Sequence, residues 1–336
     1  MKAEIRGIAY YLPELELSNE QLAADFPDWS IEKIREKTGI SNRHIVGPNE
    51  CASDLGVAAC RKLFASGVCR PGEIDFLLFC TQSPDHFLPT TACLMQERLG
   101  LPTAAGALDF NLGCSGFIYG LGLAKGLVET GQARNVLLVT ADTYSKHIHP
   151  GDRSVRTLFG DAAAATLISA GNGKGIGPFV YGTDGSGGAN LIVPSGGMRQ
   201  PRTPETAIVQ ADDQGNTRSS DNIFMDGPEI FTFTLKAVPP LVAATLEKAG
   251  TTMEGIDFFV FHQANMYMLE SLRRKIHIPK EKFLNSFDEC GNTVSSTIPI
   301  VLQDKVEEGV IRPGKRLLLV GFGVGYSWGA TVVEWA

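Results

Sequence analysis

The stretch GALDFNLGCSGFIYGLGLAKGLVE, residues 106–129, decides the fold of this 336-residue chain. Residues 106–110 are mostly apolar and predict a strand, and residues 115–129 have the apolar spacing of a helix. Cys114 lies at the junction of these two elements, just after one glycine and two residues before another. A thiol there faces the backbone N–H groups and the positive dipole end of a helix, which favour the thiolate. The junction is where we expect a nucleophile.

The other cysteines are expected to be structural, because free cysteine is often buried and behaves as a small hydrophobe. Three lie in apolar runs and three near turn-like stretches: Cys60, Cys80 and Cys93, then Cys51, Cys69 and Cys290. The chain has an odd number of cysteines, 7 in all, without a CxxC pair or a Cys/His cluster. This pattern fits neither a disulfide framework nor a zinc site, so we expect reduced thiols and no metal.

Composition excludes several classes of partner. The formal charge is −7, and lysine and arginine are scattered, which argues against nucleic acid. We find no apolar run approaching the roughly 18 residues of a membrane span, and residues 1–4 lead directly into a strand-like pattern. The expectation is a soluble, cytoplasmic protein with neither a nucleic-acid nor a membrane partner.

An internal repeat predicts the domain organisation. Residues 73–80, EIDFLLFC, resemble residues 255–262, GIDFFVFH, and VLLV at 136–139 is echoed by LLLV at 317–320. The shared order of strands and helices implies two copies of one α/β unit. We therefore predict an N-terminal half, residues 1–172, and a C-terminal half, residues 173–336.

The repeat also predicts a site. Cys114 and Asn292 follow their repeated strands at similar spacings, so they should occupy matching helix N-termini, with His262 at the end of a neighbouring strand. Open α/β sheets place ligands at the carboxyl ends of their strands. Taken singly, His262 is more typical of a hydrogen-bonded structural residue and Asn292 of a turn or N-cap residue. Together with Cys114 they supply a nucleophile, an imidazole and an amide donor for negative charge on oxygen.

Two further stretches are rich in glycine or polar residues. Residues 321–329, GFGVGYSWG, allow backbone N–H groups to turn toward a ligand, and they are equally typical of a tight turn between strands. Residues 195–222 predict an exposed loop or flap.

Several motifs, in order, resemble the β-ketoacyl-[acyl-carrier-protein] synthase III family of the thiolase superfamily. They cover nearly the whole chain: KTGI at 37–40, RH at 43–44, GCSGF at 113–117, DR at 152–153, FGD at 159–161, HQAN at 262–265, GNT at 291–293, FG at 322–323 and SWG at 327–329. The resemblance implies an α/β fold, the thiolase-like duplicated five-layer αβαβα arrangement, and a homodimer.

The resemblance also implies a reaction. Cys114 would take an acyl group from a thioester primer, which is an acyl-CoA or an acyl carrier protein, and the N–H groups of Cys114 and Val324 would form the oxyanion hole. His262 and Asn292 would stabilise the enolate left when a malonyl thioester loses CO2, and this carbanion would attack the acyl-cysteine. No metal or redox cofactor is required.

Departures from the family pattern concern the substrate. Lys33 and Lys37 stand where typical members have a tryptophan and an arginine around coenzyme A, and Trp29 lies earlier. Arg153 remains, whereas Tyr267 and Thr232 replace basic residues of the carrier region. Leu88 stands where typical members present a phenylalanine to the partner's acyl pocket, which predicts a primer longer than acetyl. The substrate-binding candidates are therefore Leu88, Arg153, Phe322 and Lys37.

Other activities stay open. Acyl transfer without condensation, in a specialised quinolone, polyketide or sugar-modifying pathway, uses the same nucleophile, and a non-catalytic partner subunit would commonly lose the cysteine. A Cys-His-Asn hydrolase has the same order of residues, although the CG[SA]C[WY] signature of papain-like proteases is absent. A hydroxymethylglutaryl-synthase-like enzyme would need an acid where this chain has Gln82.

Overall fold

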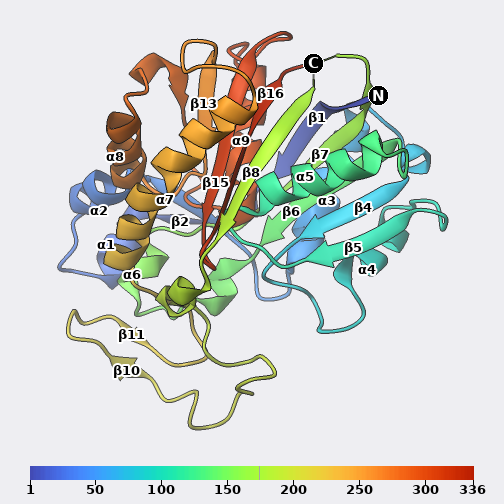
Figure 1. Cartoon of the computed structure of the whole chain (residues 1–336). Helices are drawn as coiled ribbons and strands as arrows, with labels where there is room; N and C mark the ends of the chain where they lie inside the picture. The colour runs from blue at the N-terminus through green and yellow to red at the C-terminus, as the bar shows by residue number, and fades with distance from the viewer. Residues whose placement is uncertain (174) are drawn as a thin grey trace.

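Among residues 1–173 and 175–336, which the computed structural model describes, two five-stranded mixed sheets form the centre of the molecule (Figure 1). The first has the order β1-β7-β6-β4-β5 and the second the order β8-β16-β15-β13-β14. The strands of the first sheet are β1 (Lys2–Tyr11), β4 (Phe76–Cys80), β5 (Gly106–Phe110), β6 (Asn135–Asp142) and β7 (Ala162–Gly171). Those of the second are β8 (Ile176–Thr183), β13 (Phe258–Phe261), β14 (Phe283–Leu284), β15 (Arg316–Gly323) and β16 (Ser327–Glu334).

The two sheets repeat each other in strand direction as well as in order. β4 is parallel to both β5 and β6, and β13 is parallel to both β14 and β15. At the other edge, β7 and β1 run antiparallel, as do β16 and β8. The duplicated α/β unit predicted from the EIDFLLFC and GIDFFVFH repeat is therefore present. The predicted boundary between residues 172 and 173 falls between β7 and β8, and the division into domains at that point stays a prediction.

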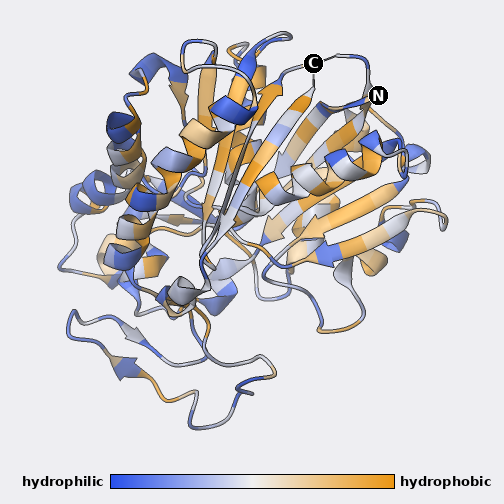
Figure 2. Ribbon diagram, in the orientation of Figure 1, coloured by the Kyte–Doolittle hydropathy of each residue, from blue (hydrophilic) through white to orange (hydrophobic). Residues whose placement is uncertain are grey.

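Helices complete five layers. α5 (Gly116–Glu129) and α9 (Thr297–Glu307) lie between the sheets, where α5 contacts strands of both. α3 (Ala52–Ala65) and α4 (Thr91–Arg98) cover the outer face of the first sheet. α7 (Gly227–Lys248) covers the outer face of the second, with α8 (Met266–Ile276) packed against α7. In Figure 2 the apolar residues gather on the strands and on the inward faces of these helices. The predicted αβαβα arrangement is confirmed.

The middle layer shows why these sequences fold this way. Phe117, Ile118 and Leu121 of α5 are buried in one apolar cluster with Val301 and Leu302 of α9. Both sheets contribute strand residues to this cluster, so α5 is apolar nearly all round, as expected of a helix buried between two sheets.

Smaller elements surround the site end of the sheets. They are β2 (Leu15–Ser18), α1 (Asn19–Asp25), α2 (Ile31–Thr38), β3 (Asn42–Ile45), α6 (Arg153–Arg156), β9 (Leu191–Ile192), β10 (Gln210–Ala211), β11 (Thr217–Arg218) and β12 (Phe224–Met225). Ser30 is the N-cap of α2 and accepts a hydrogen bond from Lys33 N at 3.2 Å.

The predicted flap, residues 195–222, is largely exposed and carries the β10–β11 hairpin, which extends away from the sheets at the bottom of Figure 1. It is not free of the body of the protein. Arg218 of β11 forms ion pairs with Asp152 at 2.7 Å and with Asp212 at 2.9 Å. Because the Asp152 side chain is fully buried, this pair holds the base of the hairpin against α6.

Two expectations need correction. By length and composition α7 is apolar enough to cross a membrane, although no such run was expected; it packs along β8, β15 and β16 as the core helix of a globular protein does. Cys93 was expected to be a buried small hydrophobe, but it is exposed because it lies on the outward face of α4. Cys51 is only partly buried, whereas the remaining four structural cysteines are buried.

Candidate active site

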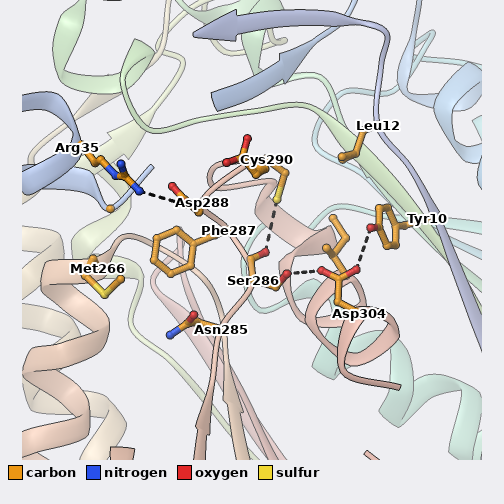
Figure 3. Close-up of a pocket in the computed structure, with 13 residues that line it drawn as sticks. Tyr10, Leu12, Arg35, Met266, Asn285, Ser286, Phe287, Asp288, Cys290 and Asp304 are labelled. Atoms are coloured by element: carbon orange, nitrogen blue, oxygen red, sulfur yellow. Dashed lines mark hydrogen bonds and ion pairs between the residues drawn. The ribbon is translucent and has the colours of Figure 1, made fainter. Parts of the chain in front are cut away.

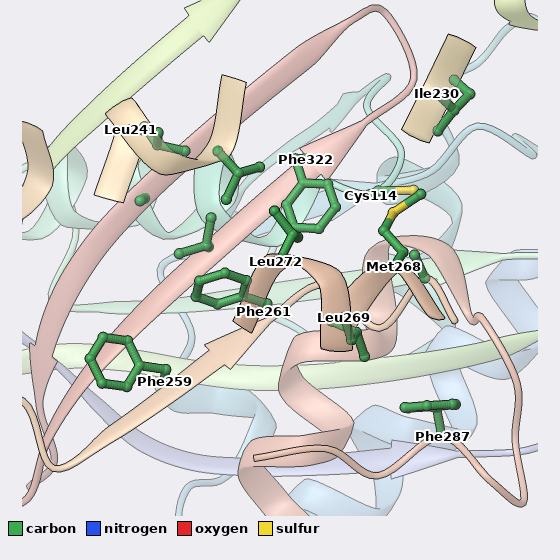
Figure 4. Packing of buried hydrophobic residues seen from close by; sticks show 14 of the residues in the cluster. Cys114, Ile230, Leu241, Phe259, Phe261, Met268, Leu269, Leu272, Phe287 and Phe322 are labelled. Carbon is green, nitrogen blue, oxygen red and sulfur yellow. The ribbon is translucent and has the colours of Figure 1, made fainter. Parts of the chain in front are cut away.

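Cys114 lies between β5 and α5, at the carboxyl end of β5, and is 5 % exposed. Ser115 is the N-cap of α5, so the thiol is at the helix N-terminus as predicted. The end of β15 passes directly beside it, and Figure 4 shows the Cys114 side chain next to the ring of Phe322. The nucleophile candidate is therefore enclosed by residues from both halves of the chain.

The charge state of the Cys114 thiol differs from the expectation. Burial, and after it the charge of Asp142, raises the pKa of Cys114 to about 12. Hydrogen bonds from the backbone of Val324 and of Cys114 itself act in the opposite direction. The helix end alone predicts a lowered pKa for the Cys114 thiol. This prediction is wrong, because desolvation raises the pKa of the thiol more than the backbone hydrogen bonds lower it. The same two backbone groups are those predicted for the oxyanion hole.

His262 directly follows β13 and is 2 % exposed. Its backbone N–H donates to the Val320 carbonyl at 2.8 Å, and its ring Nδ1 lies 2.8 Å from Thr297 Oγ1. Burial lowers the pKa of His262 to about 3, opposed by a hydrogen bond to the Val294 backbone. The imidazole is therefore neutral at physiological pH, when it has one ring N–H to donate.

Asn292 lies in the loop before α9 and is held to the first half of the chain. Its N–H donates to the Leu158 carbonyl at 2.9 Å, and its own carbonyl accepts from Gly160 N at 3.1 Å. The side-chain Oδ1 accepts a hydrogen bond from Val294 N at 3.0 Å. This contact orients the amide, and among the described residues its Nδ2 donates no hydrogen bond, so it is free to donate to a ligand.

Contacts connect the three predicted catalytic residues. Asn292 Oδ1 is bound to Val294, whose carbonyl accepts from Thr297 Oγ1 at 3.2 Å, and Thr297 contacts His262. The His262 ring meets the Phe322 ring edge to face, with centroids 5.6 Å apart, and Phe322 adjoins Cys114. The structure thus brings Cys114, His262 and Asn292 to one end of the sheets, as the repeat predicts.

The four substrate-binding candidates lie in different environments. Phe322 is 1 % exposed and forms the wall between His262 and Cys114. Leu88 is 82 % exposed on the loop between β4 and α4, outside the cluster that holds Cys114. Lys37 and Arg153 each lie over the indole of Trp29, with their charged groups 5.0 Å and 5.6 Å from the ring centroid.

Trp29 is a residue whose role the sequence comparison missed. Lys33 also lies over its ring, at 5.2 Å, so three cations surround one indole. Lys33 and Lys37 are four residues apart and share a face of α2, which a sequence can show. The approach of Arg153 from α6 depends on tertiary structure.

Asp142 and Thr297 were also missed. Asp142 is fully buried at the end of β6 and accepts hydrogen bonds from Gln82 N at 2.7 Å and Ser295 Oγ at 2.5 Å. Because Ser295 belongs to the second half, this carboxyl joins the halves beside the nucleophile. Burial raises the pKa of Asp142 to about 7. Its position at a strand end was the only signal in the sequence.

A cavity of about 450 Å³ lies next to the Asn292 loop (Figure 3). Asp304 is one of the residues that line this cavity, and its carboxylate accepts hydrogen bonds from the Tyr10 hydroxyl at 2.8 Å and from the Ser286 hydroxyl. Burial raises the pKa of Cys290, on its wall, to about 12, so this thiol is neutral. Among the described residues, no group of three or more His, Cys, Asp or Glu side chains is placed to hold a metal ion.

Comparison with known proteins agrees with this geometry. Residues 108–185 match the family model of 3-oxoacyl-[acyl-carrier-protein] synthase III, and residues 246–335 match the model of its C-terminal part. The chain is 38 % identical over 335 residues to the β-ketoacyl-[acyl-carrier-protein] synthase III of Caldanaerobacter subterraneus subsp. tengcongensis, covering 99 % of this chain and 98 % of the relative. The chain belongs to the 3-oxoacyl-[acyl-carrier-protein] synthase III family.

Solved structures of the family superpose closely on this one. A crystal structure of a 3-oxoacyl-[acyl-carrier-protein] synthase III has a TM-score of 0.99 at 53 % identity, with 100 % of both chains covered. The priming β-ketosynthase of the R1128 polyketide pathway has a TM-score of 0.86 at 29 % identity, covering 99 % of this chain and 96 % of the other. As a member of the synthase III family, the protein is an acyl-transferring condensing enzyme with a thiolase-like fold.

Proposed function

We propose that the enzyme transfers an acyl group from a thioester primer to Cys114 and condenses it with a malonyl thioester. The Cys114 sulfur attacks the primer carbonyl, and the departing thiol carries away the proton. The malonyl carboxylate then leaves as CO2, and its C–C bond electrons form an enolate. This carbanion attacks the acyl-Cys114 carbonyl, which releases the Cys114 thiolate and a 3-oxoacyl thioester.

The observation that carries this proposal is that two sets of hydrogen-bond donors lie at the same end of the sheets as the Cys114 thiol. The backbone N–H groups of Cys114 and Val324 already point at the sulfur, where the oxygen of a tetrahedral intermediate would develop negative charge. The amide of Asn292 forms the second set together with the neutral ring of His262. The ring acts as a donor in the tautomer that carries its proton on Nε2, when the Thr297 hydroxyl donates to Nδ1 instead of to the Val294 carbonyl. An enolate oxygen needs such neutral donors, and a base that removes a proton is not required because CO2 is lost instead.

The primer is proposed to be carried by coenzyme A. Trp29 offers an aromatic face for a purine, and Lys33, Lys37 and Arg153 supply positive charge for phosphates at the same place. Arg153 now lies over the indole, so it would move aside for a stacked base. An acyl carrier protein remains the alternative donor, and a binding assay with acyl-CoA against Trp29→Ala distinguishes them.

A homodimer is also proposed. β5 is an edge strand of the first sheet, and its Leu108 is 45 % exposed. Leu123 of α5 and Tyr181 of β8 are 45 % and 44 % exposed and line, with Phe110 of β5, a second cavity of about 450 Å³. An exposed apolar edge strand favours pairing with another chain. Sedimentation should give a dimer for the natural chain and a monomer for Leu108→Asp.

The predicted cytoplasmic location fits thioester substrates made inside the cell and is part of the proposal.

Intact-protein mass spectrometry tests the reaction. The enzyme is incubated with acyl-CoA and acyl-carrier thioesters and then with malonyl thioester, while CO2 release is followed. We expect a covalent acyl adduct that is lost in Cys114→Ala, and CO2 release that depends on the adduct. If no thioester acylates the protein, the proposal is wrong. Acylation without CO2 release would instead indicate acyl transfer to another acceptor, and peptide cleavage would indicate a hydrolase.

A further inference from the structure

Two polar side chains lie beside the nucleophile without a part in the reaction described above. Gln82 follows β4 and Tyr144 follows β6, and these strands are parallel neighbours, so their carboxyl ends meet. The Tyr144 hydroxyl donates to Gln82 Oε1 at 2.5 Å. We call these two residues the tyrosine–glutamine pair.

Tyr144 belongs to the apolar environment of the thiol. It is 5 % exposed and lies in the same buried cluster as Cys114, Phe159, Leu191 and Ile223. Its ring contacts the Phe159 ring with centroids 5.1 Å apart. Burial, and after it the charge of Asp142, raises the pKa of Tyr144 well above its ordinary value, so the phenol stays neutral and keeps its proton.

Gln82 lies over the backbone that leads to the nucleophile. A Cβ atom on Gly113 would be 2.5 Å from Gln82 Oε1 and 2.7 Å from the Val324 side chain, so a larger residue there would displace these side chains. Gln82 is fixed by two further contacts: its Nε2 donates to Asn111 Oδ1 at 3.0 Å, and its backbone N–H donates to Asp142. Its amide therefore has a set orientation next to the proposed oxyanion hole.

The tyrosine–glutamine pair keeps unused hydrogen-bonding capacity. The Tyr144 hydroxyl retains acceptor lone pairs, and the Gln82 amide retains one acceptor site and one N–H. A hydrocarbon chain on Cys114 that covered these groups would remove water from them without replacing its hydrogen bonds, which is unfavourable. An acyl chain with its own polar substituent would replace them.

We propose that the tyrosine–glutamine pair forms a polar wall of the acyl site and selects primers whose acyl chain carries a hydroxyl or carbonyl substituent over plain hydrocarbon chains. The proposal rests on the proposed function, because it requires an acyl group on Cys114. Phe159, Leu191 and Ile223 provide the apolar remainder of the site. The selection acts on the acyl chain, so it is independent of whether coenzyme A or a carrier protein delivers it.

Matched four-carbon thioesters test this selection in the full-length enzyme. The rate of Cys114 acylation is measured by mass spectrometry with butanoyl-CoA, (R)- and (S)-3-hydroxybutanoyl-CoA, 4-hydroxybutanoyl-CoA and 3-oxobutanoyl-CoA. We expect at least one substituted primer to react about tenfold faster than butanoyl, the effect of one hydrogen bond to a buried partner. Tyr144→Phe and Gln82→Met should each bring the ratio of the substituted to the butanoyl rate to about one, whatever either change does to the butanoyl rate itself.

The control is Tyr119→Phe, which removes a hydroxyl from the helix of the nucleophile, where it donates to the Gly182 carbonyl at 3.3 Å. This variant should keep the ratio. A natural enzyme that prefers butanoyl, or a ratio unchanged in Tyr144→Phe and in Gln82→Met, would overturn the polar wall alone. Failure of every thioester to acylate Cys114 would overturn the proposed function and the polar wall with it.

Discussion

Gly323 passes so close to Cys114 that a Cβ atom on residue 323 would lie 2.9 Å from the Cys114 Sγ atom and 2.7 Å from its Cβ atom. Both distances are shorter than the contacts that real Cβ atoms make. Residue 323 must therefore be glycine for the Cys114 thiol to keep its position. The same close approach brings the next N–H along the chain, that of Val324, within hydrogen-bonding reach of the Cys114 thiol. Glycine here serves the nucleophile rather than a turn.

Gly323→Ala should therefore displace the thiol and slow its acylation by about 100-fold, the scale on which small misplacements of reacting groups act. The rate is measured by mass spectrometry with a thioester primer, beside a melting curve. Gly126→Ala is the control, since this exposed glycine of α5 has no atom within 4 Å of an added Cβ. It should stabilise the protein by up to about 1 kcal/mol and leave the rate unchanged. An acylation rate in Gly323→Ala equal to that of the natural enzyme would contradict the geometry.

Asn292→Asp separates the two half-reactions. A carboxylate keeps the acceptor that binds Val294 N at 3.0 Å, and replaces only the Nδ2 donor by a negatively charged oxygen. The enolate oxygen would then meet a like charge, so CO2 release from malonyl thioester should fall by roughly 100-fold or more. Acylation of Cys114 from the primer should change far less. Equal losses in both half-reactions would show that Asn292 does not act on the enolate.

Thr297→Val tests the support of His262. The change removes the hydroxyl that lies 2.8 Å from Nδ1 but keeps a branched side chain of similar size. The loss of one buried hydrogen bond should lower decarboxylation about tenfold through misorientation of the imidazole. Thr297→Ser should restore it, and neither change should affect acylation of Cys114. If Thr297→Ser is as slow as Thr297→Val, the hydroxyl is not what positions the ring.

The parts of this enzyme that the sequence predicted rest on local pattern. The repeated strands 73–80 and 255–262 have the same apolar run, so their duplication and the layer order follow. Cys114 lies two residues before α5, whereas Asn292 lies five residues before α9, so the two helix N-termini match only approximately. His262 was found because it ends one of the repeated strands. Each of these inferences uses residues that are close together in the chain.

The parts that the sequence did not predict depend on residues far apart in the chain. The raised pKa of Cys114 comes from burial under β15 and from Asp142, so a helix end considered alone gave the wrong sign. The position of Trp29 beneath Arg153 depends on how α2 and α6 meet. Thr297 lies four residues beyond the Gly291-Asn292-Thr293 motif, and only the fold of that loop places its hydroxyl next to His262.

Asp142→Asn should change how stability depends on pH. Burial raises the pKa of Asp142 from 3.8 to about 7 in the folded protein, so folding opposes its ionisation. Its contribution to stability is therefore complete below about pH 4 and is lost as the pH rises through 7, by no more than about 4 kcal/mol. Asn does not ionise, so the variant lacks this loss. The free energy of unfolding of Asp142→Asn minus that of the natural enzyme should therefore be larger at pH 7.5 than at pH 4.5. Urea unfolding at both pH values measures it, and a constant difference would contradict the raised pKa.

Leu88→Phe tests both the acyl length and the proposed dimer. Leu88 is 82 % exposed in the single chain, so it can limit an acyl site only if that site belongs to a partner subunit. A larger ring there should slow acylation by hexanoyl-CoA about tenfold relative to acetyl-CoA, because overfilling a packed site costs about 1–3 kcal/mol. Met198→Phe, at a position that is 86 % exposed on the flap, should leave the ratio unchanged.

A mixed dimer tests whether Leu88 acts across the interface. One subunit carries both Cys114→Ala and Leu88→Phe, and the other subunit is natural. The Cys114 of the natural subunit should then show the altered ratio. If the ratio changes only when Leu88→Phe and the reactive Cys114 share one chain, the residue does not act across an interface.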